Sequence, residues 1–112
     1  MAELRTRPRV AVHYRLTLRN DQREGGGSTE NVSERGAMLS TDIDPPLISG
    51  EAIEVEFDLP ERGKVKVDAS VVWTSTVLPG MVGIEFTPPI PEALASHIQR
   101  LLAGELREQE AS

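Results

Sequence analysis

The chain has 112 residues, of which 38% are hydrophobic and 27% charged, and its formal net charge is -6. This length suits one domain with a modest core, and the apolar content excludes a disordered chain. There is no cysteine, which excludes disulfides and thiolate metal sites. No apolar run is long enough to span a membrane, and charged residues occupy the place of a secretory signal. We therefore expect a soluble, cytoplasmic protein.

The charge is distributed unevenly along the chain. Residues 1–23 contain six arginines and two acidic residues, whereas the remainder contains six basic and sixteen acidic residues. Proteins that bind DNA or RNA usually present a broad basic face, because their affinity comes from many neutralised phosphates. One small basic segment on an acidic body fits a small anion better than a nucleic acid polymer.

The first half of the chain shows the pattern of short strands. Alternating hydrophobic residues predict a strand from Val10 to Leu18, with His13 on its outward face. The glycine-rich segment that follows, residues 20–28, is typical of a mobile hairpin loop and lacks the lysine of a P-loop. Short strands are predicted next at residues 28–31 and 37–41.

The clearest hairpin joins two alternating segments, residues 53–59 and 65–73. If Phe57 faces Val65, acidic residues of the first strand face lysines of the second, and each such pair contributes roughly 0.2–1 kcal/mol. The charged pairs would be Asp58 with Lys64 and Glu56 with Lys66. The same alternation predicts that Trp73 packs in the core, with stacking on a ligand as the alternative.

The period changes after a further strand at residues 82–86. Leu94, Ile98 and Leu101 follow helical spacing, with Pro91 in the first turn and Gly104 at the end. The order of elements predicts a mainly all-β protein. We expect a small antiparallel six-stranded β-barrel whose C-terminal α-helix covers one opening.

Residues suited to catalysis are few. The two histidines, His13 and His97, match no metal-ligand spacing and are predicted to be structural. The acidic residues at positions 54, 56 and 58 form a solvated strand face, and no nucleophile or metalloprotease motif occurs. We predict no catalytic residues, no metal site and no cofactor, and we do not expect an enzyme.

Two short polar motifs are better candidates for a site. Asn31 and Ser33 lie two residues apart, so on an extended chain both side chains face the same way, and Gly36 follows at a kink. Taken alone, this segment is typical of a β-bulge or a turn. Arg5 and Arg9 form an R-x-x-x-R pattern before the first strand, and guanidinium groups bind anions through charge-assisted hydrogen bonds.

The order R-x-x-x-R, one strand and loop, then N-x-S-x-x-G resembles the PilZ domain family, whose members are receptors for cyclic di-GMP. Three later segments, "GEAIEVEFDLP", "VVW" and "GMVGIEF", are each similar to their counterparts in the family. The resemblance covers nearly the whole chain, from Arg5 to Leu102. It implies a PilZ-like barrel at residues 10–104, a flexible ligand-closing arm at 1–9 and a tail at 105–112.

The resemblance also implies which residues bind the ligand. The arm arginines would contact guanine and phosphate, Asn31 and Ser33 would supply hydrogen bonds, and Gly36 would keep the surface open. The implied ligand-binding residues are Arg5, Arg9, Asn31, Ser33 and Gly36. Arg7 and Leu4 are additional candidates, and an apolar residue at position 4 fits a single ligand molecule better than a stacked pair.

The implied function is that of a cyclic di-GMP receptor and adaptor. The arm would close over the nucleotide, and the changed surface would signal to a partner protein in bacterial motility, exopolysaccharide or virulence control. No membrane insertion is expected. The alternative is a PilZ-fold interaction module that does not bind nucleotide. Binding of RNA or DNA by the barrel would need exposed aromatic residues on a basic face, and that reading is disfavoured.

Overall fold

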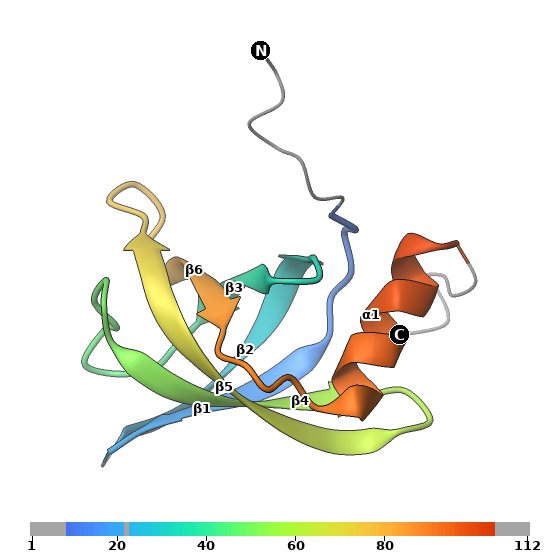
Figure 1. Ribbon diagram of the computed structural model, residues 1–112. Helices are drawn as coiled ribbons and strands as arrows, with labels where there is room; N and C mark the ends of the chain where they lie inside the picture. The colour runs from blue at the N-terminus through green and yellow to red at the C-terminus, as the bar shows by residue number, and fades with distance from the viewer. Residues whose placement is uncertain (1–8, 22, 105–112) are drawn as a thin grey trace.

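The structure is a computed structural model that describes residues 9–21 and 23–104. Within these ranges, the strands are β1 (Arg15–Asn20), β2 (Arg23–Val32), β3 (Gly36–Thr41), β4 (Ala52–Leu59), β5 (Gly63–Thr74) and β6 (Met81–Phe86), and the helix is α1 (Glu92–Leu102). The strands close into an antiparallel barrel in the order β1-β2-β3-β6-β5-β4 (Figure 1). The predicted fold, a six-stranded barrel followed by a helix, is confirmed.

The barrel interior is filled by the hydrophobic residues that alternate along the strands. Leu18, Val55 and Phe57 are completely buried, and the ring of Phe57 meets that of Phe86 edge to face at 6.0 Å. In the β4–β5 hairpin, Phe57 lies opposite Val65, which confirms the predicted register. The same register sets acidic residues 56 and 58 opposite lysines 66 and 64. This hairpin is therefore specified by local sequence alone.

The glycine-rich segment is not the mobile loop that the sequence predicts. Asn20, the last residue of β1, already pairs with Arg23, the first residue of β2, and all three consecutive glycines lie within β2, paired with β1. At Gly27, a Cβ atom would lie 2.3 Å from the carbonyl oxygen of Ser40 on β3. Gly25 and Gly27 allow other backbone segments to approach closely, and all three glycines are part of the barrel wall. Because that need arises from a distant strand, the local composition suggested a loop instead.

Trp73 is also placed differently from its prediction. The register between β5 and β6 shifts between Val71 and Trp73, so the alternation of inward and outward residues breaks there. The side chain of Trp73 turns outward, is 41% exposed and lies against Gly83. The prediction that Trp73 packs in the core is therefore wrong, and a β-bulge is the cause.

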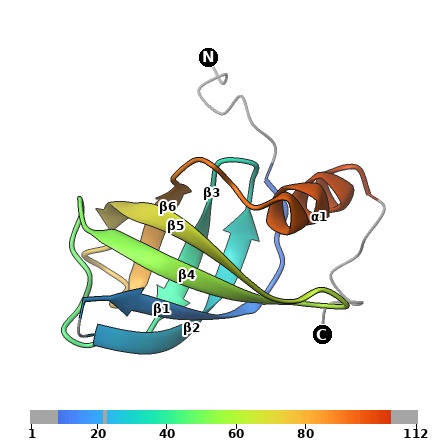
Figure 2. The same cartoon turned by 60° about the horizontal axis from the view of Figure 1, so that its bottom comes forward.

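The helix α1 lies across one end of the barrel, beside residues 10–14 and near the tip of the β4–β5 hairpin (Figures 1 and 2). Its buried face consists of Leu94, His97, Ile98 and Leu101. Pro91 precedes the helix as its N-cap, and Gly104 follows it with a left-handed φ of 81°. In the part of the chain described, no helix is long and apolar enough to cross a bilayer.

Candidate ligand-binding site

The two polar motifs meet beside the C-terminal end of β2. The guanidinium of Arg9 donates a hydrogen bond from Nη1 to Oδ1 of Asn31 at 2.7 Å, although 22 positions separate the two residues. Both side chains reach solvent at least in part. The other arm candidates, Leu4, Arg5 and Arg7, lie outside the described residues. The structure thus brings together one residue of each motif.

The backbone next to Arg9 holds this arrangement in place. Val10 and Val32 form an isolated antiparallel bridge, in which each amide donates to the other's carbonyl at 2.9 Å. The bridge connects the residue after Arg9 to the residue after Asn31. The base of the N-terminal arm is therefore fixed against β2, and the position of Arg9 is set by main-chain bonds.

A threonine that the sequence analysis did not single out provides a second attachment. Thr29 is completely buried, and its hydroxyl donates to the carbonyl of Val12 while accepting from the amide of Tyr14. The backbone amide of Thr29 also donates to the Tyr14 carbonyl at 3.0 Å. Residues 12–14 are thereby bonded to β2 without forming a regular strand, so β1 begins at Arg15 and not at Val10.

The same region contains the bulge that orients Asn31. The register between β2 and β3 shifts between Thr29 and Asn31, so Val32 turns into the core and Asn31 turns toward solvent. A regular strand would instead give Asn31 the inward orientation of Thr29. The only trace of this bulge in the sequence is the spacing of three between the buried Thr29 and Val32.

Replacing Thr29 by valine is expected to lower the free energy of unfolding by about 2–3 kcal/mol. Valine has nearly the same shape, but it leaves the Tyr14 amide and the Val12 carbonyl without their buried partner. Urea denaturation of the variant measures the loss. Thr17→Val, at a half-buried position of β1, is the matched control and should change stability by less than about 0.5 kcal/mol. Equal stability of the two variants would contradict the structural role of Thr29.

Ser33 stabilises the turn that joins β2 to β3. Its hydroxyl is buried, donates to the carbonyl of Gly36 at 3.3 Å and accepts from the amides of Arg35 and Gly36. The carbonyl of Arg35 in turn accepts from the amide of Phe86 at 2.8 Å, which fastens the turn to the end of β6. Ser33 thus shapes the surface beside Asn31, and its predicted contact with a ligand stays a prediction.

Gly36 is required by packing between strands. A Cβ atom at this position would lie 2.1 Å from the carbonyl oxygen of Ile84 on β6, far inside van der Waals contact. The resemblance implied a different reason, an unobstructed ligand surface. The structure gives the glycine a role in barrel closure, whether or not a ligand also approaches it.

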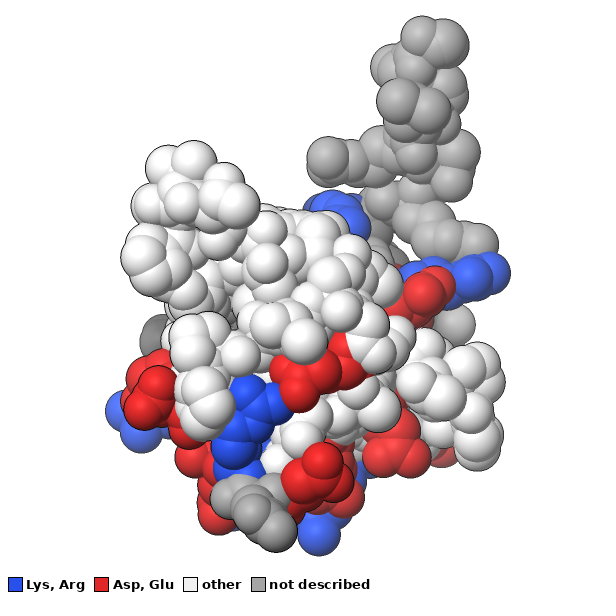
Figure 3. Space-filling model, turned by 90° about the vertical axis from the view of Figure 1, so that its left-hand side faces the viewer, with Lys and Arg blue, Asp and Glu red and all other residues white. Residues whose placement is uncertain are grey.

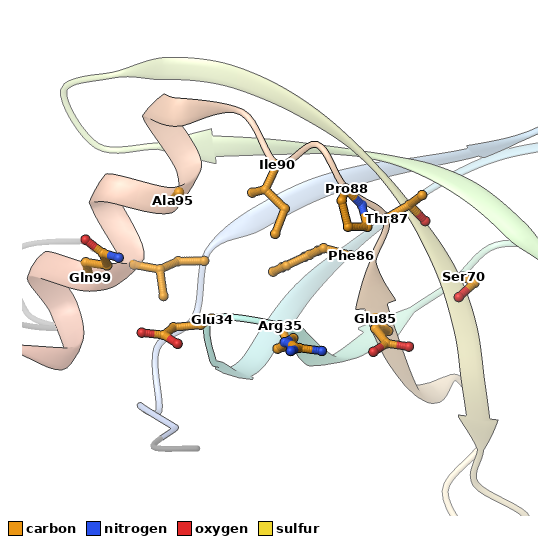
Figure 4. A pocket seen from close by; sticks show the side chains of 11 residues that line it. Glu34, Arg35, Ser70, Glu85, Phe86, Thr87, Pro88, Ile90, Ala95 and Gln99 are labelled. Atoms are coloured by element: carbon orange, nitrogen blue, oxygen red, sulfur yellow. The ribbon is translucent and has the colours of Figure 1, made fainter. Parts of the chain in front are cut away.

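A pocket of about 610 Å³ lies beside this turn, between the end of β6 and helix α1. In Figure 4, the charged side chains of Glu34, Arg35 and Glu85 lie along one edge, Ile90 lies along the opposite edge, and Phe86 lies between them. The pocket therefore offers an apolar interior with both signs of charge at its rim. Arg35 is a second guanidinium close to the motif, and the sequence analysis did not single it out.

The helix is attached to the base of the arm by a buried polar pair. His97 is 3% exposed, and its Nε2 lies 2.7 Å from the hydroxyl of Tyr14. The other ring nitrogen, Nδ1, is buried and has no hydrogen-bond partner among the described residues. Burial lowers the pKa of His97, and the positive charges of Arg62 and Arg100 lower it further, against a smaller opposite effect of Glu61. The prediction of a structural role for His97 fits this contact.

Stability is expected to fall as the pH is lowered from about 7.5 to 5.5. The pKa of His97 is lower in the folded chain than its ordinary value of 6.5. The unfolded chain therefore binds the proton first, so stability is full above that value and is lost as the pH falls through the folded pKa. Urea denaturation at several pH values measures the slope, which His97→Gln should flatten. A slope insensitive to His97→Gln would contradict the assignment.

The described residues contain no group of three or more His, Cys, Asp or Glu side chains that could hold a metal ion. The polar groups that the structure gathers at this site are instead a guanidinium, a carboxamide, and a turn rich in backbone amides. Such groups bind anions and the hydrogen-bonding edges of nucleobases.

A model of the PilZ domain matches residues 3–104, and the chain belongs to this family. Among solved structures, the PilZ domain of YcgR from Escherichia coli with c-di-GMP has a TM-score of 0.70 and 14% identity, and the match covers 89% of each chain. The PilZ domain of CeSA from a cellulose-synthesizing bacterium has a TM-score of 0.64 and 17% identity, over 88% of this chain and 97% of that one.

The Bacillus subtilis inhibitor of motility, MotI/DgrA, has a TM-score of 0.71 and 15% identity over 90% of this chain. The chain spans 50% of the length of that protein. A search of curated protein sequences finds no significant match. At these identities, the likeness to solved structures establishes the barrel-and-helix fold.

Proposed function

We propose that this protein is a receptor for cyclic di-GMP that closes its N-terminal arm over the nucleotide and signals to a partner protein. The observation that carries this proposal is the contact of Arg9 with Asn31, which joins the two motifs on one surface. Membership of the PilZ family and the YcgR structure with c-di-GMP support the choice of ligand. The proposed role is non-catalytic and cytoplasmic, and the ligand is the only small molecule it requires.

The chemistry of the pair suits the ligand. Cyclic di-GMP presents two guanines and two phosphates, and a guanidinium fork can bind the O6/N7 edge of guanine or two phosphate oxygens. One N–H group of Arg9 is engaged by Asn31, which orients the fork while the side chain stays exposed. Preorganisation of this kind lowers the entropy lost when the ligand binds.

The arm completes the site in this proposal. Arg5 precedes Val10 by five residues, so an extended chain lets it reach about 17 Å from the fixed base at Val10. That span suits a second arginine closing over a ligand held at Arg9. The closing segment would be residues 1–9, because the bridge to Val32 holds the chain from Val10 onward. Leu4 and Arg7 would flank the ligand.

Isothermal titration calorimetry of the purified protein with cyclic di-GMP tests the proposal, with GTP and cyclic AMP as controls. We expect saturable binding of cyclic di-GMP and no binding of GTP or cyclic AMP. Absence of heat and of any ligand-induced spectral change, at concentrations well into the micromolar range, would overturn it. The protein would then be an interaction module on a PilZ fold.

The downstream process follows from the same proposal. MotI is described as an inhibitor of motility, and CeSA belongs to a cellulose-synthesizing bacterium. We propose that this chain acts in motility or exopolysaccharide control, through contact of its liganded form with another protein.

A further inference from the structure

The barrel end opposite helix α1 carries large hydrophobic side chains that are exposed. Within the described ranges, the exposed large hydrophobic residues all lie in two places, at residue 48 and in the stretch of residues 72–78. They are Ile48, Val72, Trp73, Val77 and Leu78, and we call them the apolar end. Figure 3 faces this end of the barrel and shows a broad uncharged surface, with most charged side chains gathered below it. Concentrated exposure of this kind marks interaction sites in soluble proteins.

The exposed side chains of the β5–β6 loop are held outward by ordered hydrogen bonds. The hydroxyl of Ser75 accepts from the amides of Val77 and Leu78 at 3.1 and 2.9 Å. The loop is fastened to β3 because the amide of Thr41 donates to the Gly80 carbonyl at 2.9 Å. Val77 is nevertheless 80% exposed, so it contributes almost nothing to the core. Apolar residues on a well-formed turn serve contact with another surface better than folding.

The second segment is fastened in the same way. The amide of Ile48 donates to a carboxylate oxygen of Glu51 at 2.9 Å, and the hydroxyl of Ser49 donates to the Val72 carbonyl at 3.2 Å. Ile48 is thereby held next to the exposed stretch of β5. The apolar end is a fixed surface contributed by the loop that carries Ile48, the last residues of β5 and the β5–β6 loop.

A groove of about 560 Å³ runs between these loops, and it carries only negative charge. Ile43, Leu47 and Val82 are among its apolar lining residues, and Asp42 and Asp44 are its charged ones. The nearby Arg23 forms an ion pair with Glu51 and donates hydrogen bonds to the carbonyls of Pro45 and Pro46. A partner that covers this end therefore gains from positive charge placed around an apolar centre.

We propose that the apolar end docks a partner protein whose contact surface has aliphatic or aromatic residues flanked by Lys or Arg. A second copy of this chain is a poorer occupant, because the chain carries a net charge of -6 and would bring its aspartates against those of its copy. The surface lies away from Arg9 and Asn31, so its occupation is compatible with a bound nucleotide.

Selection from a random peptide phage library on the full chain tests this proposal, with counter-selection on the double variant Val77→Ser, Leu78→Ser. The serines remove apolar surface at exposed positions and leave the backbone bonds of the loop in place. We expect enriched sequences in which apolar residues are flanked by Lys or Arg. A lack of enrichment over the variant, or enrichment of acidic sequences, would overturn the proposal.

A selected peptide, made synthetically, allows a quantitative check. Trp73 is the only tryptophan of the chain and belongs to the apolar end, so its fluorescence reports occupation. We expect at least tenfold weaker binding by the double variant and severalfold weaker binding by Asp44→Asn or at high salt. Glu92→Gln, at the start of helix α1, is the charge control and should leave binding unchanged; equal effects of the two acid substitutions would contradict the charge argument.

Two further measurements separate the alternatives. Sedimentation velocity of the unliganded chain should show no dimer formed through the apolar end. A dimer that the double variant abolishes would mean that a second copy occupies this surface, and it would overturn the proposal. Calorimetry with cyclic di-GMP should give the same affinity for the double variant and the wild type. A variant that loses the peptide but keeps the nucleotide therefore tests this surface independently of the proposed receptor function.

Discussion

Replacing Arg9 by alanine is expected to weaken cyclic di-GMP binding by about 5- to 150-fold. This range corresponds to about 1–3 kcal/mol, the discrimination that one bidentate guanidinium–base contact provides. Calorimetric titration measures the change. Arg9→Lys should recover little of the loss, because lysine keeps the charge but lacks the planar fork that Asn31 orients.

Arg15→Ala is the matched control for this result. Arg15 is an exposed arginine on β1 that contributes the same charge to the same half of the chain. Its removal should change the affinity by less than about twofold, the effect of a remote surface charge. Equal losses in the two variants would show that only the overall charge matters, and an unchanged affinity for Arg9→Ala would remove Arg9 from the site.

Replacing Gly36 by alanine is expected to lower the free energy of unfolding by about 3 kcal/mol, the upper end of the usual cost of overpacking. The new methyl group would lie 2.1 Å from a main-chain carbonyl of β6, which cannot move without disturbing barrel closure. Urea denaturation without nucleotide measures the loss. A variant that keeps its stability but loses nucleotide binding would show that Gly36 is needed for the ligand surface instead.

Gly26→Ala is the control for the substitution at Gly36. Gly26 lies in the neighbouring strand β2, and the nearest atom to a Cβ there is the Leu16 carbonyl oxygen at 4.0 Å. An alanine at that position fits, and restricting the unfolded chain should make it neutral or stabilising by up to about 1 kcal/mol. A large loss at both glycines would mean that this barrel wall rejects any side chain.

The parts of the fold that were predictable are those that depend on neighbours along the chain. The alternation in β4 and β5 and the opposite charges across them determine their register, and the helical spacing from Leu94 to Leu101 determines the buried face of α1. The candidate site was partly predictable because Arg9 and Asn31 carry recognisable side chains. Their contact was not, since 22 positions separate them and a bridge at Val10 brings them together.

The errors have one physical origin, which is the irregularity that closing a small barrel requires. A bulge near Trp73 turns an expected core residue outward, and a bulge near Asn31 gives that residue its exposed orientation. Gly27 of β2 and Gly36 of β3 are needed because backbone atoms of other strands come close to them. Neither the bulges nor the close backbone contacts can be predicted from residues that are neighbours along the chain.

By itself, the sequence determined the class of fold, the central hairpin and the chemical types of the candidate ligand contacts. These follow from periodicity, charge pairing and side-chain identity, which act over short stretches of chain. Only the tertiary structure decided where the arm is anchored, which way Trp73 faces, why Gly36 lacks a side chain, and that the apolar end forms one surface. Each of these depends on contacts between strands distant in sequence, because hydrogen bonding and packing across a closed barrel override local preference.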